Sequence, residues 1–222
     1  MPSKNNANLE PQSQLVFLAL VVLSFLFWVL YRFIFNFPVF FDELFGKAIF
    51  FGIPLLIYAS ATKKHDIAEA MSPSKLFPGL LRGLAFGGLL GFFSLILLSL
   101  RSSIALLSIP VFMTDWFWSE FLLALMTAFF ESIFFFGFIQ TTLATFWGKS
   151  ELVKTVLTTA SIFLIFHLPN IAMRFAGIQA IAMVGLLFCF GLGQALLFVK
   201  EKNIYPLIIT HAIWGMILLI HF

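Results

Sequence analysis

The chain has 222 residues, of which 61% are hydrophobic and only 10% charged, with 32 phenylalanines and a mean hydropathy of +1.05. So apolar a composition excludes a soluble globular domain of this size. The apolar runs do not alternate with a two-residue period, which excludes a membrane β-barrel. The formal net charge is +3, with the basic residues between apolar segments, so we expect no nucleic-acid partner.

Apolar segments alternate with short polar joints along the whole chain. They predict an all-α fold, a polytopic transmembrane helical bundle of about seven spans, within a range of six to eight. Residues 1–13 are expected to form a polar cytoplasmic tail, and residues 14–222 a single transmembrane domain. The predicted segments are 14–35, 44–61, 78–100, 116–146, 153–169, 177–199 and 204–221.

Basic residues are distributed unevenly between the two sides of this predicted bundle. Nine of the 13 fall in or close to the N-terminal tail and the even-numbered joints, and four in or close to the odd-numbered joints. The positive-inside rule then places the N-terminus in the cytoplasm. We expect an integral protein of a bacterial inner or plasma membrane, with the lipid bilayer as a partner and an oligomeric state that the sequence does not determine.

Ionisable side chains are rare inside the predicted spans. Glu131 lies midway along the fourth segment, in "TAFFESIFFFGFIQTTL", with no basic residue nearby in the sequence. His167 lies near the end of the fifth segment and His211 within the seventh. We expect Lys47 and Arg174 near span ends, where long basic side chains reach the interface. Asn170, directly after Pro169, is interpreted as a turn residue.

Taken singly, each of these three groups has a structural interpretation as a hydrogen-bonded residue between helices. Taken together, they suggest chemistry. A carboxylate beside imidazoles in an apolar site is an arrangement that activates a water molecule as a nucleophile. Such groups inside a membrane are costly, and they commonly mark functional sites.

The order "FESIFFFGFIQ", "FLIFH", "THAIWG" resembles the CAAX-protease and bacteriocin-processing family of intramembrane proteases, also called the Abi family. The family motifs are Glu-Glu-x-x-x-Arg, Phe-x-x-x-His and His-x-x-x-Asn (or Asp). The resemblance covers a core of about residues 115–222.

Some positions match these motifs and others depart from them. Matches are Glu131 in the first motif with Gly137 after it, Phe163 and His167 in the second, and His211 in the third. Ser132 stands in place of the second Glu, Phe136 in place of the Arg, and Gly215 in place of the Asn. Because both an acid and a base are missing, we expect their ion pair to be absent.

The resemblance implies an endopeptidase of the glutamate type, acting on a peptide or membrane-protein substrate and needing no cofactor. Glu131 and His167 would activate water, and His211 would stabilise the oxyanion. Ser132, Phe163, Gly215 and Trp214 would have supporting positions, with the Trp214 indole N–H as a substitute for the missing Asn donor.

Three other interpretations stay open from the residues. The departures at Ser132, Phe136 and Gly215 fit an inactive member of the family that serves as a scaffold or a bacteriocin-immunity protein. Glu131, His167 and His211 could instead bind zinc, although no His-Glu-x-x-His helix is present. A proton-coupled transporter could use the same groups, but the sequence has no evident internal repeat.

Overall fold

The computed structural model describes residues 11–62, 66–102 and 116–221, and the described residues are organised as helices joined by short turns. In the N-terminal half, α1 (Pro11–Ile34) precedes α2 (Val39–Phe41), which continues through π-helical turns η1 (Asp42–Gly46) and η2 (Ala48–Gly52) into α3 (Ile53–Thr62). Then follow α4 (Asp66–Ala70), η3 (Pro73–Lys75) and α5 (Leu76–Ser102).

The C-terminal half opens with one long helical rod. Its parts are α6 (Phe117–Glu131), the π-helical stretch η6 (Ser132–Gln140) and α7 (Thr141–Trp147). The remaining elements are η7 (Lys149–Glu151), α8 (Leu152–Arg174), α9 (Gly177–Glu201) and α10 (Tyr205–His221). We refer to residues 117–147 as the central rod and to residues 39–62 as the second helix.

The predicted fold class is confirmed. Six helices among the described residues are long and apolar enough to cross a membrane, and α10 adds a seventh apolar helix of 17 residues. The long fourth segment is one continuous helix and contains no additional span. The six are Gln12–Ile34, Val39–Ala61, Ile67–Phe93, Phe117–Trp147, Leu152–Arg174 and Gly177–Glu201.

Two predicted boundaries were wrong in ways that matter for function. The second helix begins at Val39 rather than at 44, so Lys47 lies well inside it. Helix α8 continues through Pro169 to Arg174, although a proline cannot donate its backbone hydrogen bond. Asn170 is therefore a helical residue and not a turn residue. α1 already begins at Pro11, inside the predicted polar tail, whose first ten residues lie outside the described part of the chain.

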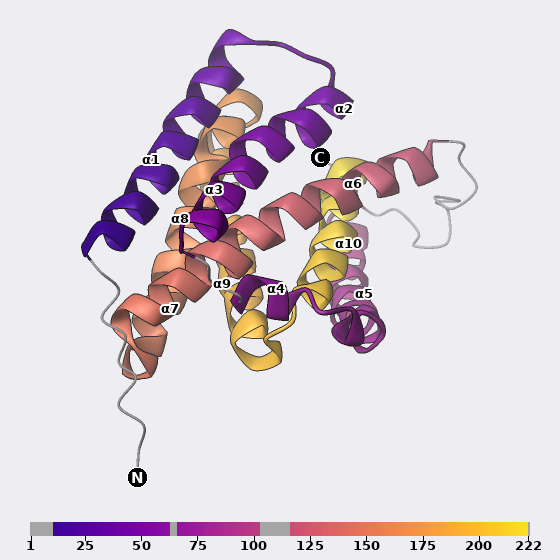
Figure 1. Cartoon of the computed structure of the whole chain (residues 1–222). Coiled ribbons are helices and arrows are strands. Elements are labelled where there is room, and N and C mark those ends of the chain that lie inside the picture. Colours follow the sequence, from indigo (N-terminus) through magenta and orange to yellow (C-terminus); the bar gives the residue numbers. More distant parts are fainter. Residues whose placement is uncertain (1–10, 63–65, 103–115, 222) are drawn as a thin grey trace.

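The central rod crosses the middle of the molecule (Figure 1). α10 packs against both the rod and α5, while the second helix and α8 contact the rod elsewhere. The residues of η6 are all buried, and they include the phenylalanines of the motif stretch. These aromatic rings form the core between helices rather than a surface facing lipid, which fixes the rod and the side chain of Glu131 at its centre.

Glycines on α5 determine how closely α10 can approach. A Cβ added at Gly83 would lie 2.7 Å from the Cβ of Ile209, and one added at Gly87 would lie 3.1 Å from the Cα of Thr210. Real Cβ atoms would force the two helices apart. Small residues spaced by four allow such close packing of membrane helices. The contact therefore fixes the position of α10, which carries His211.

Candidate active site

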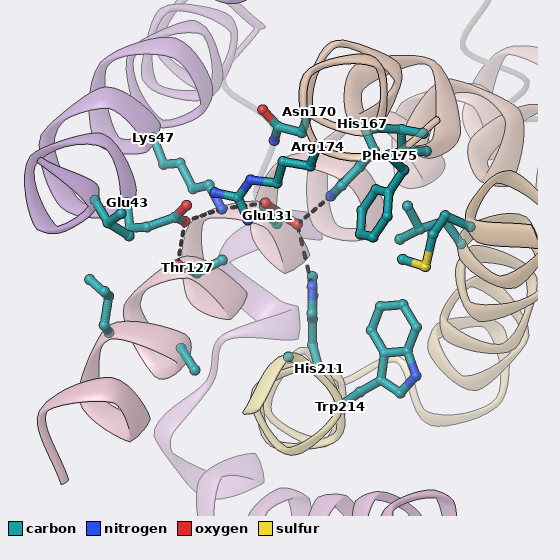
Figure 2. A pocket seen from close by; sticks show the side chains of 17 residues that line it. Glu43, Lys47, Thr127, Glu131, His167, Asn170, Arg174, Phe175, His211 and Trp214 are labelled. Atoms are coloured by element: carbon teal, nitrogen blue, oxygen red, sulfur yellow. Dashed lines mark hydrogen bonds and ion pairs between the residues drawn. The ribbon is translucent and has the colours of Figure 1, made fainter. Parts of the chain in front are cut away.

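The structure brings together the three ionisable groups that the sequence singles out. The Oε2 atom of Glu131 lies 3.3 Å from Nε2 of His167 and 3.4 Å from Nε2 of His211. The groups come from the central rod, α8 and α10 (Figure 2). The Glu131 side chain is only 4% exposed, so three helices enclose the carboxylate. Their catalytic role stays a prediction, but the shared space that it requires is present.

The ring of His167 is oriented by its own helix. Its Nδ1 lies 2.7 Å from the carbonyl oxygen of Phe163, one turn earlier. A carbonyl only accepts, so Nδ1 carries the proton and Nε2 of the neutral ring has a free lone pair. Nε2 and the Glu131 carboxylate are then two acceptors facing each other. A water molecule beside this pair has two O–H donors, one for each acceptor.

The ring of His211 approaches the same carboxylate oxygen from α10. Its face and edges are packed by aromatic rings, with the Phe190 centroid 5.1 Å away and the Phe163 centroid 6.0 Å away. Its Nδ1 is buried and has no hydrogen-bond partner among the described residues. The ring is thus held by packing, and Nε2 is the nitrogen aimed at the reactive space.

Lys47 belongs to this site, although no sequence motif indicated it. Its ammonium lies 2.6 Å from Oε1 of Glu131, and its side chain is 6% exposed. The prediction that Lys47 sits at the interface was therefore wrong, and the cation beside Glu131 comes from a residue distant in the sequence. The signal was hidden because the partners are 84 positions apart in the sequence and the helix begins earlier than hydropathy suggested.

Glu43 completes this cluster on the second helix. It forms an ion pair with Lys47, and its Oε2 accepts a hydrogen bond of 2.6 Å from the Thr127 hydroxyl of the central rod. Thr127 and Glu131 lie one turn apart on the rod, as Glu43 and Lys47 do on the second helix. The four side chains therefore link the two helices through charges and hydrogen bonds (Figure 2).

Positions that depart from the family motifs have different surroundings. Phe136 is fully buried against Phe163, and the buried hydroxyl of Ser132 has no hydrogen-bond partner among the described residues. Trp214 stacks on Phe190 at 4.0 Å between centroids. At Gly215, an added Cβ would meet no atom within 4 Å. The place of the missing Asn is therefore open space.

A cavity of about 590 Å³ opens onto the Glu131 carboxylate. This size falls within the range typical of ligand sites. Its polar lining includes Glu43, Lys47, Asn170 and Arg174, and its apolar lining includes Leu187 and Trp214. Asn170 and Arg174 extend the face of α8 that carries His167, since they follow it by one and two turns. Figure 2 shows both in the wall of the cavity.

Within the described ranges, no group of three or more His, Cys, Asp or Glu side chains is arranged to hold a metal ion. The cation that contacts Glu131 is the ammonium of Lys47. One carboxylate oxygen is thus held by a protein cation, and the other faces the two imidazoles. This division of the two oxygens is the main chemical feature of the site.

Comparison with known proteins agrees with this geometry. Residues 113–217 match the family described as type II CAAX prenyl endopeptidase Rce1-like. The matched region contains Glu131, His167 and His211, but not Glu43 or Lys47. No curated protein and no solved structure matches the chain. Over this region, which is just under half of its length, the chain is similar to the CAAX prenyl endopeptidases.

Proposed function

We propose that the protein is an intramembrane endopeptidase in which Glu131 and His167 activate a water molecule. The observation that carries this proposal is the position of Glu131 Oε2, 3.3 Å from His167 Nε2 and 3.4 Å from His211 Nε2 inside a cavity. Oε2 accepts no hydrogen bond from the described residues. A buried acceptor in that state has a strong preference for a donor such as water.

In the proposed reaction, the water donates one hydrogen to Glu131 Oε2 and the other to His167 Nε2. Its oxygen attacks the carbonyl carbon of the scissile peptide while Glu131 takes one proton. His211, protonated at Nε2, donates a hydrogen bond to the oxyanion that forms. Collapse of this intermediate breaks the carbon–nitrogen bond, and the proton on Glu131 passes to the departing amine. The products are a new amine and a new carboxylic acid, which ionises by releasing its proton to water.

The proposed substrate is a peptide segment held at the membrane. The name of the matched family suggests a prenylated cysteine near a C-terminus as the first probe to use. We expect the purified protein in lipid vesicles to cleave a fluorescence-quenched peptide of this kind. In water enriched in ¹⁸O, mass spectrometry should find one labelled oxygen in the new carboxylate after one turnover. Absence of cleavage, with this probe and with an unprenylated peptide library, would refute the proposal.

A second function is favoured by one specific observation, which is Gly215 in the place of the family's Asn. Loss of an oxyanion donor typically lowers the rate by about 10²–10³. A chain so weakened could act as a scaffold or an immunity protein against a peptide toxin. A scaffold or immunity role would survive Glu131→Gln, whereas a role that depends on peptide cleavage would be lost. A toxin-survival assay with this variant therefore separates the two.

We also propose that the N-terminus faces the cytoplasm, on the strength of the basic residues in the even-numbered joints. The cavity lies toward the end of the bundle that holds the start of the second helix and the end of α8. In this orientation it belongs to the non-cytoplasmic half of the membrane. A prenylated tail in the cytoplasm would reach it only if the orientation were reversed. Labelling of single cysteines introduced at positions 150 and 176 tests the orientation.

The proposed mechanism uses side chains alone and needs no cofactor. Metal analysis of the purified protein, combined with activity before and after treatment with a chelator, tests this point. We expect full activity in the protein without zinc. Stoichiometric zinc whose removal abolishes cleavage, and whose return restores it, would instead favour binding by Glu131, His167 and His211.

A further inference from the structure

The second helix carries two charged residues beside Glu131, and it lies outside the region that matches the family. Lys47 and Glu43 are both in the cavity wall, and Lys47 is among the most buried charged residues described. Neither belongs to the motif stretches. Burial of charges costs free energy unless they are paired and hydrogen-bonded. Lys47 pairs with both Glu43 and Glu131, so each of these three charges has a partner of opposite sign.

The contacts give Lys47 a defined geometric effect on Glu131. Its ammonium holds Oε1 at 2.6 Å, and this leaves Oε2 directed at the two imidazoles. The carboxylate therefore has one oxygen fixed by a charged hydrogen bond and one available for water. An ammonium at this distance also stabilises the carboxylate in its ionised form, which is the form that can accept a proton.

Glu43 has the corresponding effect on Lys47. A flexible lysine side chain can adopt many rotamers, and a single contact to Glu131 would not select one. The ion pair with Glu43 supplies a second fixed point, and the Thr127 hydroxyl holds Glu43 in turn. Thr127 is on the same rod as Glu131. The chain of contacts from Glu131 through Lys47 and Glu43 therefore ends on the helix on which it began. The π-helical turns η1 and η2 flank Lys47, and such turns occur frequently at functional sites.

We propose that Lys47 and Glu43 are positioning residues for the reaction, and that beside Glu131 they act in place of the base and the second acid that the motif lacks at Phe136 and Ser132. The replacement comes from another helix, so an acid and a base beside the catalytic carboxylate are present although the motif itself lacks them. This inference rests on the proposed function for its kinetic consequence, but its effect on the charge of Glu131 does not depend on catalysis.

The first arm of the experiment measures that charge without any substrate. Infrared spectra of the protein in lipid vesicles distinguish an ionised carboxylate from a protonated one by its C=O stretch. We expect no band from a protonated carboxyl at Glu131 in the original protein. Lys47→Met should produce such a band, and the double variant Lys47→Met with Glu131→Gln should lose it. Absence of the new band in Lys47→Met would overturn the proposal.

The second arm measures cleavage of the quenched prenylated peptide. Lys47→Met should lower kcat by about 100-fold with little change in KM, and Lys47→Arg should recover most of the loss because it keeps the charge. Glu43→Gln should lower kcat by about 10-fold, since it loosens Lys47 without removing it. Lys154→Met makes the same chemical change on the exposed start of α8 and should have no effect.

The two arms separate the inference from the proposed function. Original protein that cleaves no peptide, together with the expected infrared bands, would refute the peptidase but keep the role of Lys47. Active protein in which Lys47→Met cleaves normally, or in which Lys47→Arg is as impaired as Lys47→Met, would refute the role of its charge. If Lys47→Met fails to fold, Lys47→Arg and Glu43→Gln decide the question: unchanged kcat in Glu43→Gln and loss in Lys47→Arg would overturn it.

Discussion

The central rod and the second helix contribute to the same carboxylate in different ways. The rod carries Glu131 inside a stretch that resembles a family motif, and this region falls within the matched residues 113–217. The second helix carries Glu43 and Lys47 in a stretch with no recognisable motif. In the proposed reaction the first region supplies the reacting group, and the second holds that group through Lys47. The charged neighbours of Glu131 thus come from outside the stretch that resembles the motif.

Removing the reacting group should have the largest effect. Glu131→Gln keeps the size and shape of the side chain but cannot accept a proton. We expect kcat for the quenched peptide to fall by at least about 10³-fold, in keeping with the usual contribution of a general base. Glu120→Gln, at the start of the same rod, is the matched control and should cleave normally. Residual activity within tenfold of the original protein would contradict the assignment of Glu131.

Removing either imidazole should have a smaller effect, because Glu131 would remain. His167→Ala and His211→Ala are each expected to lower kcat by about 10²–10³-fold, one through the water and the other through the oxyanion. His65→Ala changes a histidine outside the spans and serves as the control. Because both residues face one oxygen, the double variant should lose less than the product of the single effects. Independent multiplication would indicate separate sites.

Restoring the missing motif residue should raise activity. Gly215→Asn introduces an amide where an added Cβ meets no atom within 4 Å, so the side chain can be accommodated. We expect kcat to rise by about 10-fold or more, because an additional donor near the oxyanion stabilises the transition state. Gly215→Leu fills the same space without a donor and should not raise it. An increase in both variants would mean that volume, not hydrogen bonding, is limiting.

Weakening the support of α10 should have the smallest effect on chemistry and the clearest effect on stability. Gly83→Leu forces a side chain into the contact with Ile209 and should destabilise the fold by about 1–3 kcal/mol, as overpacking usually does. Gly88→Leu is the control. Gly88 directly follows Gly87, which contacts α10, but a Cβ added at Gly88 meets no atom within 4 Å. Thermal unfolding in detergent compares the two, and equal melting temperatures would contradict the packing argument.

Hydropathy and motif order determined much of this protein without coordinates. Long apolar segments can satisfy their backbone in a membrane only as helices, so the number and order of spans follow from composition. The motif stretches singled out Glu131, His167 and His211 because ionisable groups are conspicuous among apolar residues. Even the open position at Gly215 was visible as a departure from the family pattern.

Only the tertiary structure showed what holds Glu131. Hydropathy locates a helix end only to within a few residues. The predicted start at residue 44 therefore placed Lys47 at the edge of a helix, whereas the observed start at Val39 places it inside. The pairing of Lys47 with Glu131 depends on how two helices distant in sequence pack, which no local pattern encodes. The same applies to Asn170 and Arg174, which line the cavity because α8 continues through Pro169. The sequence singled out the groups proposed to react, and the packing of the helices decided which side chains contact them.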